Sequence, residues 1–262
     1  YKEATFDNIK KAIDEIFEKV ANDINTHGKI VKVLIYLSGH GELVNGKSAF
    51  CPKDAIPKKK NYIFADLFTK WLEEGVKRIK ESERDKIYID IILDFCHSGG
   101  FAGAGDINGG AQGICRVAGC GKKPDALSNL ATSNLLKDKI VVLQACMKDE
   151  ETIEEKTGIT AFLPPKNPFY NCWAKPFDGF GWFTNEILTE INTASRSTSI
   201  EDIFKRIGSR YQWGIKPYVI HLKKYECQHP EMYDGHPDVD QEILKPIILA
   251  SISKPESGYM YL

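Results

Sequence analysis

The sequence has almost no net charge and no long apolar run, and both deficits exclude classes of function. Lys and Arg together number 35 and Asp and Glu 36 among 262 residues, so the formal charge is -1. Nucleic-acid-binding domains usually carry a clear basic excess, so we expect no nucleic-acid partner. No stretch approaches the roughly 18 apolar residues of a membrane-spanning helix, so we expect no membrane partner either.

The cysteines lack the regular spacing of a disulfide-stabilised domain. The seven cysteines are scattered, at positions 51, 96, 115, 120, 146, 172 and 227. This distribution argues against a framework of paired disulfides and for a reducing compartment, so we expect a cytoplasmic protein. Because the count is odd, at least one thiol stays unpaired within the chain and is available as a nucleophile.

Apolar periodicity predicts an alternation of helices and strands, which is typical of an α/β fold with a mostly parallel central sheet flanked by helices. The spacing predicts a helix from Phe6 to Ile24, with Thr5 as N-cap and Gly28 as the stop. Further helices are predicted at 64–79, 182–191 and 200–211, and strands at 31–37, 87–95, 140–145, 218–222 and 247–252. Segments 98–125 and 224–246 break the pattern and are expected to be long loops. No repeat or sharp boundary divides the chain, so residues 1–262 are predicted to form a single domain.

Two predicted strands end in chemically reactive residues. His40 lies just after the first strand and Cys96 just after the second. Ligands of parallel α/β sheets bind beyond the carboxyl ends of the strands, so neighbouring strands would place an imidazole beside a thiol and activate it. Gly41 lets a backbone N–H approach a developing oxyanion, and the Cys96 amide can supply a second donor.

The same region also matches a nucleotide-binding pattern. Residues Gly41–Ser48 read G-x-x-x-x-G-K-S after a strand, and an apolar run ends at Asp94 in the manner of a metal-binding strand. A P-loop must lead directly into a helix whose N-terminus holds the phosphates. Pro52 and Pro57 follow instead, so we interpret the segment as a loop and keep a P-loop NTPase as the less favoured alternative.

Metal-ligand spacing is poor throughout the chain. His221, Cys227, His229 and His236 lie close in sequence but lack a usual zinc spacing, and Cys115 and Cys120 lie at the wide end of the range. We therefore expect no metal site.

The two strand-end motifs together resemble those of the caspase-like cysteine peptidases, and most closely the metacaspases. The motifs are Ser38-Gly39-His40-Gly41 and, with Cys96 following His40 by 56 residues, Asp94-Phe95-Cys96-His97-Ser98-Gly99. The resemblance extends to residues 50–54, 142–146 and 181–184, and covers roughly residues 5 to 215.

This resemblance implies a caspase-like fold and a role for each matching residue. Cys96 would be the nucleophile and His40 its base and leaving-group acid, with the amides of Gly41 and Cys96 as the oxyanion hole. Asp94 falls at the position of an acidic residue of the S1 pocket, which implies protein or peptide substrates with Arg or Lys at P1. Glu150 or Glu151 could add negative charge to that pocket. Members often cut themselves in the loop after the nucleophile, where Arg116, Lys122 and Lys123 are candidate sites.

The sequence also departs from the family pattern. The family begins with a strand and a helix that this chain, which starts at Tyr1, lacks, so we expect the first strand to be absent. Either the chain is a processed or truncated fragment, or another segment, such as an upstream regulatory segment or a partner chain, fills the gap. Asp54 resembles one calcium ligand of the calcium-dependent members, but the expected acidic pair reads Ala65-Asp66, so we expect no cofactor and consider calcium dependence doubtful. A catalytically silent caspase-homology domain that recruits partners remains an alternative, although the presence of both His40 and Cys96 favours an enzyme.

Overall fold

A computed structural model describes residues 3–55, 61–103, 114–117, 126–152, 182–193, 202–204, 206–207 and 230–235. The α-helices are α1 (Phe6–His27), α2 (Ala65–Lys77) and α3 (Trp182–Thr193), and the short 3-10 helices are η1 (Glu81–Lys86), η2 (Ser98–Gly100) and η3 (Asn129–Thr132). The strands are β1 (Val31–Ser38), β2 (His40–Val44), β3 (Lys47–Cys51), β4 (Ile63–Phe64), β5 (Ile87–Asp94), β6 (Ile114–Val117), β7 (Ile140–Gln144) and β8 (Glu231–Asp234). Over these residues, no helix combines the length and the apolar character needed to cross a bilayer.

The central sheet is mostly parallel, as the alternation of helices and strands predicts. Its five strands lie in the order β1-β5-β7-β8-β6. Strands β1, β5 and β7 pair in parallel, whereas β8 is antiparallel to both β7 and β6. Among the described strands, four therefore run in one direction and β8 runs against them, which confirms the predicted α/β class.

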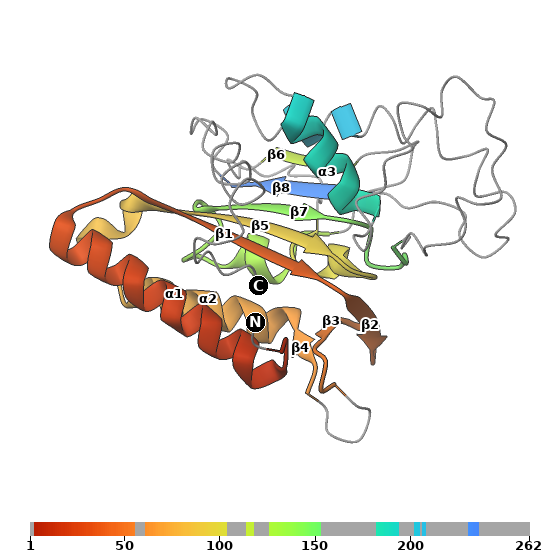
Figure 1. Ribbon diagram of the computed structural model, residues 1–262, viewed down its shortest axis with the longest axis horizontal. Coiled ribbons are helices and arrows are strands. Elements are labelled where there is room, and N and C mark those ends of the chain that lie inside the picture. Colours follow the sequence, from red (N-terminus) through yellow and green to blue (C-terminus); the bar gives the residue numbers. More distant parts are fainter. Residues whose placement is uncertain are drawn as a thin grey trace, which may run out of the picture.

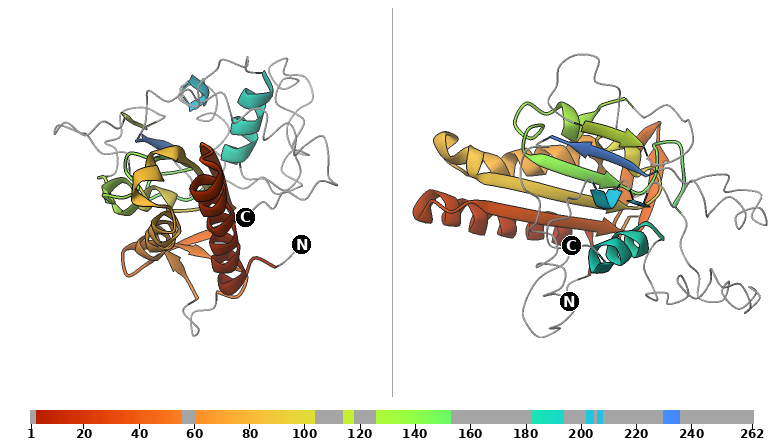
Figure 2. Two further views of the ribbon diagram at one scale, coloured as in Figure 1. Left: turned by 90° about the vertical axis from the view of Figure 1, so that its left-hand side faces the viewer. Right: turned by 90° about the horizontal axis from the view of Figure 1, so that it is seen from above.

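Helices cover both faces of this sheet. Helices α1 and α2 lie together on one face and α3 lies on the other (Figures 1 and 2). The sheet is therefore buried on both sides, which explains the nearly continuous apolar runs of β5 and β7. The face beneath α1 and α2 holds the larger of two apolar clusters, and the α3 face holds the smaller one with Phe183, Ile187, Phe204 and Met232.

Helix α1 begins and ends where its sequence predicts. The Thr5 side chain accepts a hydrogen bond from the Asn8 amide at 3.4 Å, and Gly28 adopts the left-handed conformation at the C-cap with φ 64°. The Asp54 carboxylate also accepts the Phe6 N–H at 2.8 Å, which places a negative charge at the positive end of the helix. Asp54 therefore stabilises the N-terminus of α1 in this structure.

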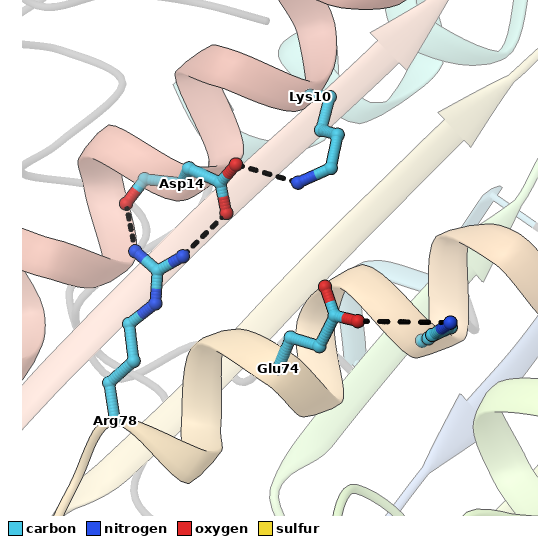
Figure 3. A network of polar contacts seen from close by, with 5 residues as sticks. Lys10, Asp14, Glu74 and Arg78 are labelled. Atoms are coloured by element: carbon cyan, nitrogen blue, oxygen red, sulfur yellow. Dashed lines mark hydrogen bonds and ion pairs between the residues drawn. The ribbon is translucent and has the colours of Figure 1, made fainter.

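A polar network ties α1 to α2 on their solvent side (Figure 3). Arg78 donates to the backbone oxygen of Asp14 at 2.9 Å and to its carboxylate at 2.7 Å, and Lys10 donates to the same carboxylate at 2.7 Å. The hydrogen bond from Lys10 is the largest cause that lowers the pKa of Asp14. Beneath the network the helices approach closely, since a β-carbon on Gly75 would lie 2.4 Å from the Phe17 ring.

Two strands lie in segments that the sequence predicts to be loops, so this part of the prediction is wrong. Strand β6 lies within 98–125, β8 lies within 224–246, and the two strands pair with each other. Strand β8 lacks the alternating pattern because both its terminal residues, Glu231 and Asp234, are acidic and yet buried. The candidate strands at 218–222 and 247–252 lie outside the described residues.

The segment matching the P-loop pattern is a β-hairpin rather than a loop, and the described residues directly after it, 52–55, are not helical. Strands β2 and β3 pair antiparallel around Asn45 and Gly46, whose φ values of 52° and 74° are those of the tight turn that Asn-Gly favours. Ser48, the serine of the pattern, lies buried in β3 against the backbone position of Gly100. Because the pattern lacks the helix N-terminus that holds phosphates, the P-loop alternative is wrong.

Candidate active site

The carboxyl ends of β1 and β5 lie side by side. Ser38 is the register partner of Asp94, and the Gly39 amide continues the ladder by donating to the Asp94 carbonyl at 3.2 Å. His40 and Cys96 each lie two residues beyond this last pair. The sheet therefore delivers the two predicted catalytic residues to the same edge.

The backbone of Gly41 packs directly on the backbone of Cys96. A β-carbon on Gly41 would lie 2.0 Å from the Cys96 carbonyl oxygen and 2.7 Å from the Phe95 ring. Only a residue without a side chain allows this approach. The glycine after the histidine is thus one point at which the β2–β3 hairpin contacts the loop that carries the thiol.

The side chains of His40 and Cys96 do not hydrogen-bond to each other in this structure. His40 is exposed and Cys96 is partly exposed. Across the hairpin, His40 is the register partner of Cys51, so these two side chains lie on the same face. The tertiary structure places His40 at the start of β2, next to the loop that carries Cys96.

The loop of Cys96 is held by the segment that follows β7. His97 adopts a left-handed conformation, with φ 65°, and its amide donates to the Glu150 carbonyl at 2.8 Å. Its ring Nδ1 lies 2.9 Å from the Lys148 carbonyl oxygen, and the Gly99 amide donates to the Cys146 carbonyl at 2.8 Å. Residues 96–100 and 146–150 therefore form one hydrogen-bonded unit.

Two other cysteines whose side chains the structure describes, Cys51 and Cys146, lie in surroundings that disfavour the thiolate. Cys51, Cys96 and Cys146 are all free thiols. Burial raises the pKa of Cys51 to about 11, with smaller contributions from the negative charge of Glu42 and from Cys96. Burial also raises the pKa of Cys146 strongly, and its thiol donates to the Glu150 carbonyl at 3.3 Å. Among these three cysteines, the surroundings favour Cys96 as the reactive one.

Thr152 contacts the sulfur of Cys96, and no sequence pattern pointed to it. The Thr152 amide donates to Sγ at 3.2 Å, and the Thr152 hydroxyl lies 3.5 Å from the same atom. Thr152 is buried. The contact joins residues 56 positions apart, so only the tertiary structure reveals it.

The carboxylate of Asp94 lies at the start of α3. It accepts the Thr184 amide at 3.2 Å and also the Thr184 hydroxyl. The Tyr36 hydroxyl lies 2.9 Å from that threonine oxygen. Asp94 is only 3% exposed, so its charge is buried and is held against the N-terminal turn of a helix. Sequence reasoning missed Tyr36 and Thr184, although it placed a helix start near residue 182.

The two candidate glutamates lie in different surroundings. Glu150 is buried, and its carboxylate accepts the Met147 amide at 3.2 Å within its own turn. Glu151 is exposed.

The candidate self-cleavage residues are only partly described. Arg116 lies in β6 opposite Met232 of β8, so the segment around it belongs to the sheet. Lys122 and Lys123 lie outside the described residues, as do Cys120, His221, Cys227, His229 and His236. Within the described part of the chain, no group of three or more His, Cys, Asp or Glu side chains is arranged to hold a metal ion.

Comparison with known proteins identifies the family. A family model described as the caspase domain of the C14 peptidases matches residues 1–212. A search of the curated proteins finds no match to this chain. The family match covers most of the chain and includes both strand-end motifs, and the fold agrees with it. The chain therefore belongs to the caspase-domain family of cysteine peptidases.

Proposed function

We propose that this protein is a cysteine endopeptidase of the metacaspase kind that cleaves peptide bonds after Arg or Lys, with Cys96 as nucleophile and His40 as base. The observation that carries the proposal is the packing of Gly41 on the Cys96 backbone, because it brings the histidine-bearing hairpin onto the loop of the thiol. A catalytically silent binding domain is the alternative, and the test below separates the two.

The proposed chemistry proceeds in two half-reactions. His40 takes the proton of the Cys96 thiol, and the thiolate attacks the carbonyl carbon of the scissile bond. The amides of Gly41 and Cys96 donate to the oxyanion of the tetrahedral intermediate. His40 then gives its proton to the leaving amine as the C–N bond breaks, which leaves a thioester on Cys96. Water, deprotonated by His40, hydrolyses the thioester and releases the acid.

A basic P1 residue is the preference that the acidic side chains near the thiol support. Asp94 lies two residues before Cys96. Its carboxylate is buried and already accepts the Thr184 amide and hydroxyl, so its contribution to the pocket is the negative charge that it places near the thiol. Glu151 is exposed and can add negative charge for an approaching substrate, whereas the Glu150 carboxylate is engaged by the Met147 amide. Arg would gain a bidentate contact that Lys cannot make.

Self-cleavage after the nucleophile loop remains part of the proposal, with Lys122 and Lys123 favoured over Arg116. A peptidase binds its substrate as an extended and accessible strand, and Arg116 would first have to leave its pairing with β8. Mass spectrometry of the active enzyme tests this step: a cut after Lys122 or Lys123 supports it, and an uncut active chain contradicts it.

Free thiols at Cys51, Cys96 and Cys146 fit the proposed reducing, cytoplasmic environment.

The decisive experiment uses fluorogenic peptides with Arg, Lys or Asp at P1, each with and without calcium. We expect hydrolysis of the Arg and Lys peptides by the unmodified chain and none by Cys96→Ala or His40→Ala. Asp94→Asn should selectively lose the basic substrates. Full activity in Cys96→Ala or His40→Ala contradicts the assigned dyad. An unchanged P1 preference in Asp94→Asn shows that Asp94 does not belong to the pocket. If the unmodified chain hydrolyses no peptide, the result favours the binding domain.

A further inference from the structure

We propose that Thr152 is a thiolate-stabilising residue, whose backbone N–H and side-chain hydroxyl hold the charged form of Cys96 ready for attack. The inference rests on the proposed function only in taking Cys96 as the nucleophile. Its claim about the sulfur itself stands on the contacts of Thr152.

Both polar groups of Thr152 that can donate are directed at the same sulfur. The amide donates at 3.2 Å, and an amide N–H has no other role, so the sulfur must accept this bond in either protonation state. The hydroxyl at 3.5 Å can accept from the neutral thiol or donate to the thiolate. Deprotonation of Cys96 therefore turns the Thr152 pair from one donor and one acceptor into two donors, which favours the charged sulfur.

Thr152 is positioned in advance by the turn that precedes it. The Glu150 carbonyl, two residues earlier, accepts the His97 amide at 2.8 Å and the Cys146 thiol at 3.3 Å. The Glu150 carboxylate closes the turn through the Met147 amide at 3.2 Å. Because His97 directly follows Cys96, the hydrogen bond from its amide fixes the nucleophile loop against the segment that leads to Thr152.

The need for such a residue follows from the resting position of the histidine. The His40 ring makes no hydrogen bond to the sulfur within the described part of the chain, so no direct hydrogen bond from His40 holds the sulfur in this state. A thiolate without donors is poorly stabilised in a partly buried site. In our proposal, Thr152 supplies the donors while His40 carries the proton that leaves the thiol.

The test measures how fast iodoacetamide alkylates Cys96 across pH, in the full chain, with mass spectrometry resolving the Cys96 peptide. Thr152→Val removes the hydroxyl but keeps the shape and the N–H. We expect it to slow alkylation at neutral pH by about threefold to tenfold and to move the profile to higher pH, because a hydrogen bond to a charged group is lost. Thr152→Ser, which keeps both donors, should behave as the unmodified chain.

Two further variants separate the contributions. Thr152→Pro removes the N–H as well, and we expect a loss of about tenfold or more in the same assay. Thr26→Val, on the exposed side of α1, removes a threonine hydroxyl far from the sulfur and should change nothing. If Thr152→Pro does not fold, as thermal unfolding would reveal, the Val and Ser variants still decide the question.

The outcomes distinguish this inference from the proposed function. An alkylation profile that is unchanged in Thr152→Val and Thr152→Pro contradicts the inference, and faster alkylation shows that Thr152 restrains the sulfur instead of activating it. Alkylation does not depend on peptide hydrolysis, so the result stands even if no peptide is cleaved. If peptides are cleaved, kcat/KM should fall in the same order as the alkylation rate.

Discussion

A β-carbon on Gly41 would lie 2.0 Å from the carbonyl oxygen of Cys96, well inside the contact distance of the two atoms. The neighbouring atoms belong to the backbone and to the buried Phe95 ring, so neither can move aside easily. The β2–β3 hairpin can therefore carry His40 to Cys96 only if the residue after the histidine is glycine.

Gly41→Ala should separate the hairpin from the nucleophile loop. We expect a loss of about 1–3 kcal/mol in the free energy of unfolding from the overpacked contact, and a fall in kcat/KM of about 100-fold from the displaced residues. Chemical denaturation and peptide hydrolysis measure the two effects. Gly46→Ala is the matched control: no atom lies within 4 Å of its β-carbon, so only the strain of φ 74°, about 1 kcal/mol, applies. Full hydrolysis by Gly41→Ala would show that the contact does not position the dyad.

The described thiols should react in a fixed order. Burial raises the pKa of Cys51 to about 11 and raises that of Cys146 further, so both are protonated at neutral pH. We expect alkylation at pH 7 to modify Cys96 first, with Cys51 following only as the pH approaches 11 and Cys146 only on unfolding. Peptide mapping after timed alkylation measures this order, and early modification of Cys51 would contradict it.

Thr184→Val should weaken the anchor between β5 and α3. The substitution removes the hydroxyl that donates to the buried Asp94 carboxylate and meets the Tyr36 hydroxyl. We expect a cost of about 1–3 kcal/mol, since buried polar groups lose a partner, whereas Thr184→Ser should retain most of the stability. Urea denaturation gives both values. A Thr184→Val variant as stable as the unmodified chain would show that the hydroxyl does not stabilise this anchor.

Besides the carboxylate of Asp94, the α3 face of the sheet also buries an ion pair. Lys32 on β1 and Asp90 on β5 lie 2.9 Å apart, with side chains 6% and 1% exposed. Lys32→Met leaves the Asp90 carboxylate buried without its counter-charge, so we expect a loss of about 3–5 kcal/mol. The double variant Lys32→Met with Asp90→Leu should recover most of that loss, because both desolvated charges are then gone. Equal stability of the single and double variants would contradict this account.

The same pair should make stability depend on pH. Burial raises the pKa of Asp90 to about 6, against the opposing attraction of Lys32. The folded carboxyl thus binds its proton more tightly than the unfolded carboxyl, with a pKa of about 3.9. Its contribution to stability is therefore fully present below about pH 4 and is lost as the pH rises through 6. Asp90→Asn should remove this part of the pH dependence, which denaturation at pH 4, 5.5 and 7 would reveal.

Most of the elements around the site could be predicted from local sequence patterns. The sequence predicts both ends of α1, at Thr5 and Gly28, because capping depends on a few neighbouring residues. The turn at Asn45-Gly46 is equally local and was available as a hairpin signal, but the P-loop pattern over the same residues obscured it. Strand β8 could not be predicted from hydropathy, because the sheet buries its two acidic ends.

By itself the sequence determined the α/β class, the family and the two residues at the strand ends, because these follow from periodicity and from short motifs. Only the tertiary structure decided what surrounds them. Thr152 meets Cys96 across 56 positions and Thr184 meets Asp94 across 90. Such contacts arise when the sheet register and the packing of α3 bring distant segments together, and no local pattern encodes that distance. From the near-zero net charge and the scattered cysteines we expected no nucleic-acid partner and no disulfide framework. The fold then distinguishes Cys96 from Cys51 and Cys146: burial raises the pKa of the half-buried Cys51 and of the fully buried Cys146, whereas the Cys96 sulfur accepts a hydrogen bond from the Thr152 amide at the sheet edge.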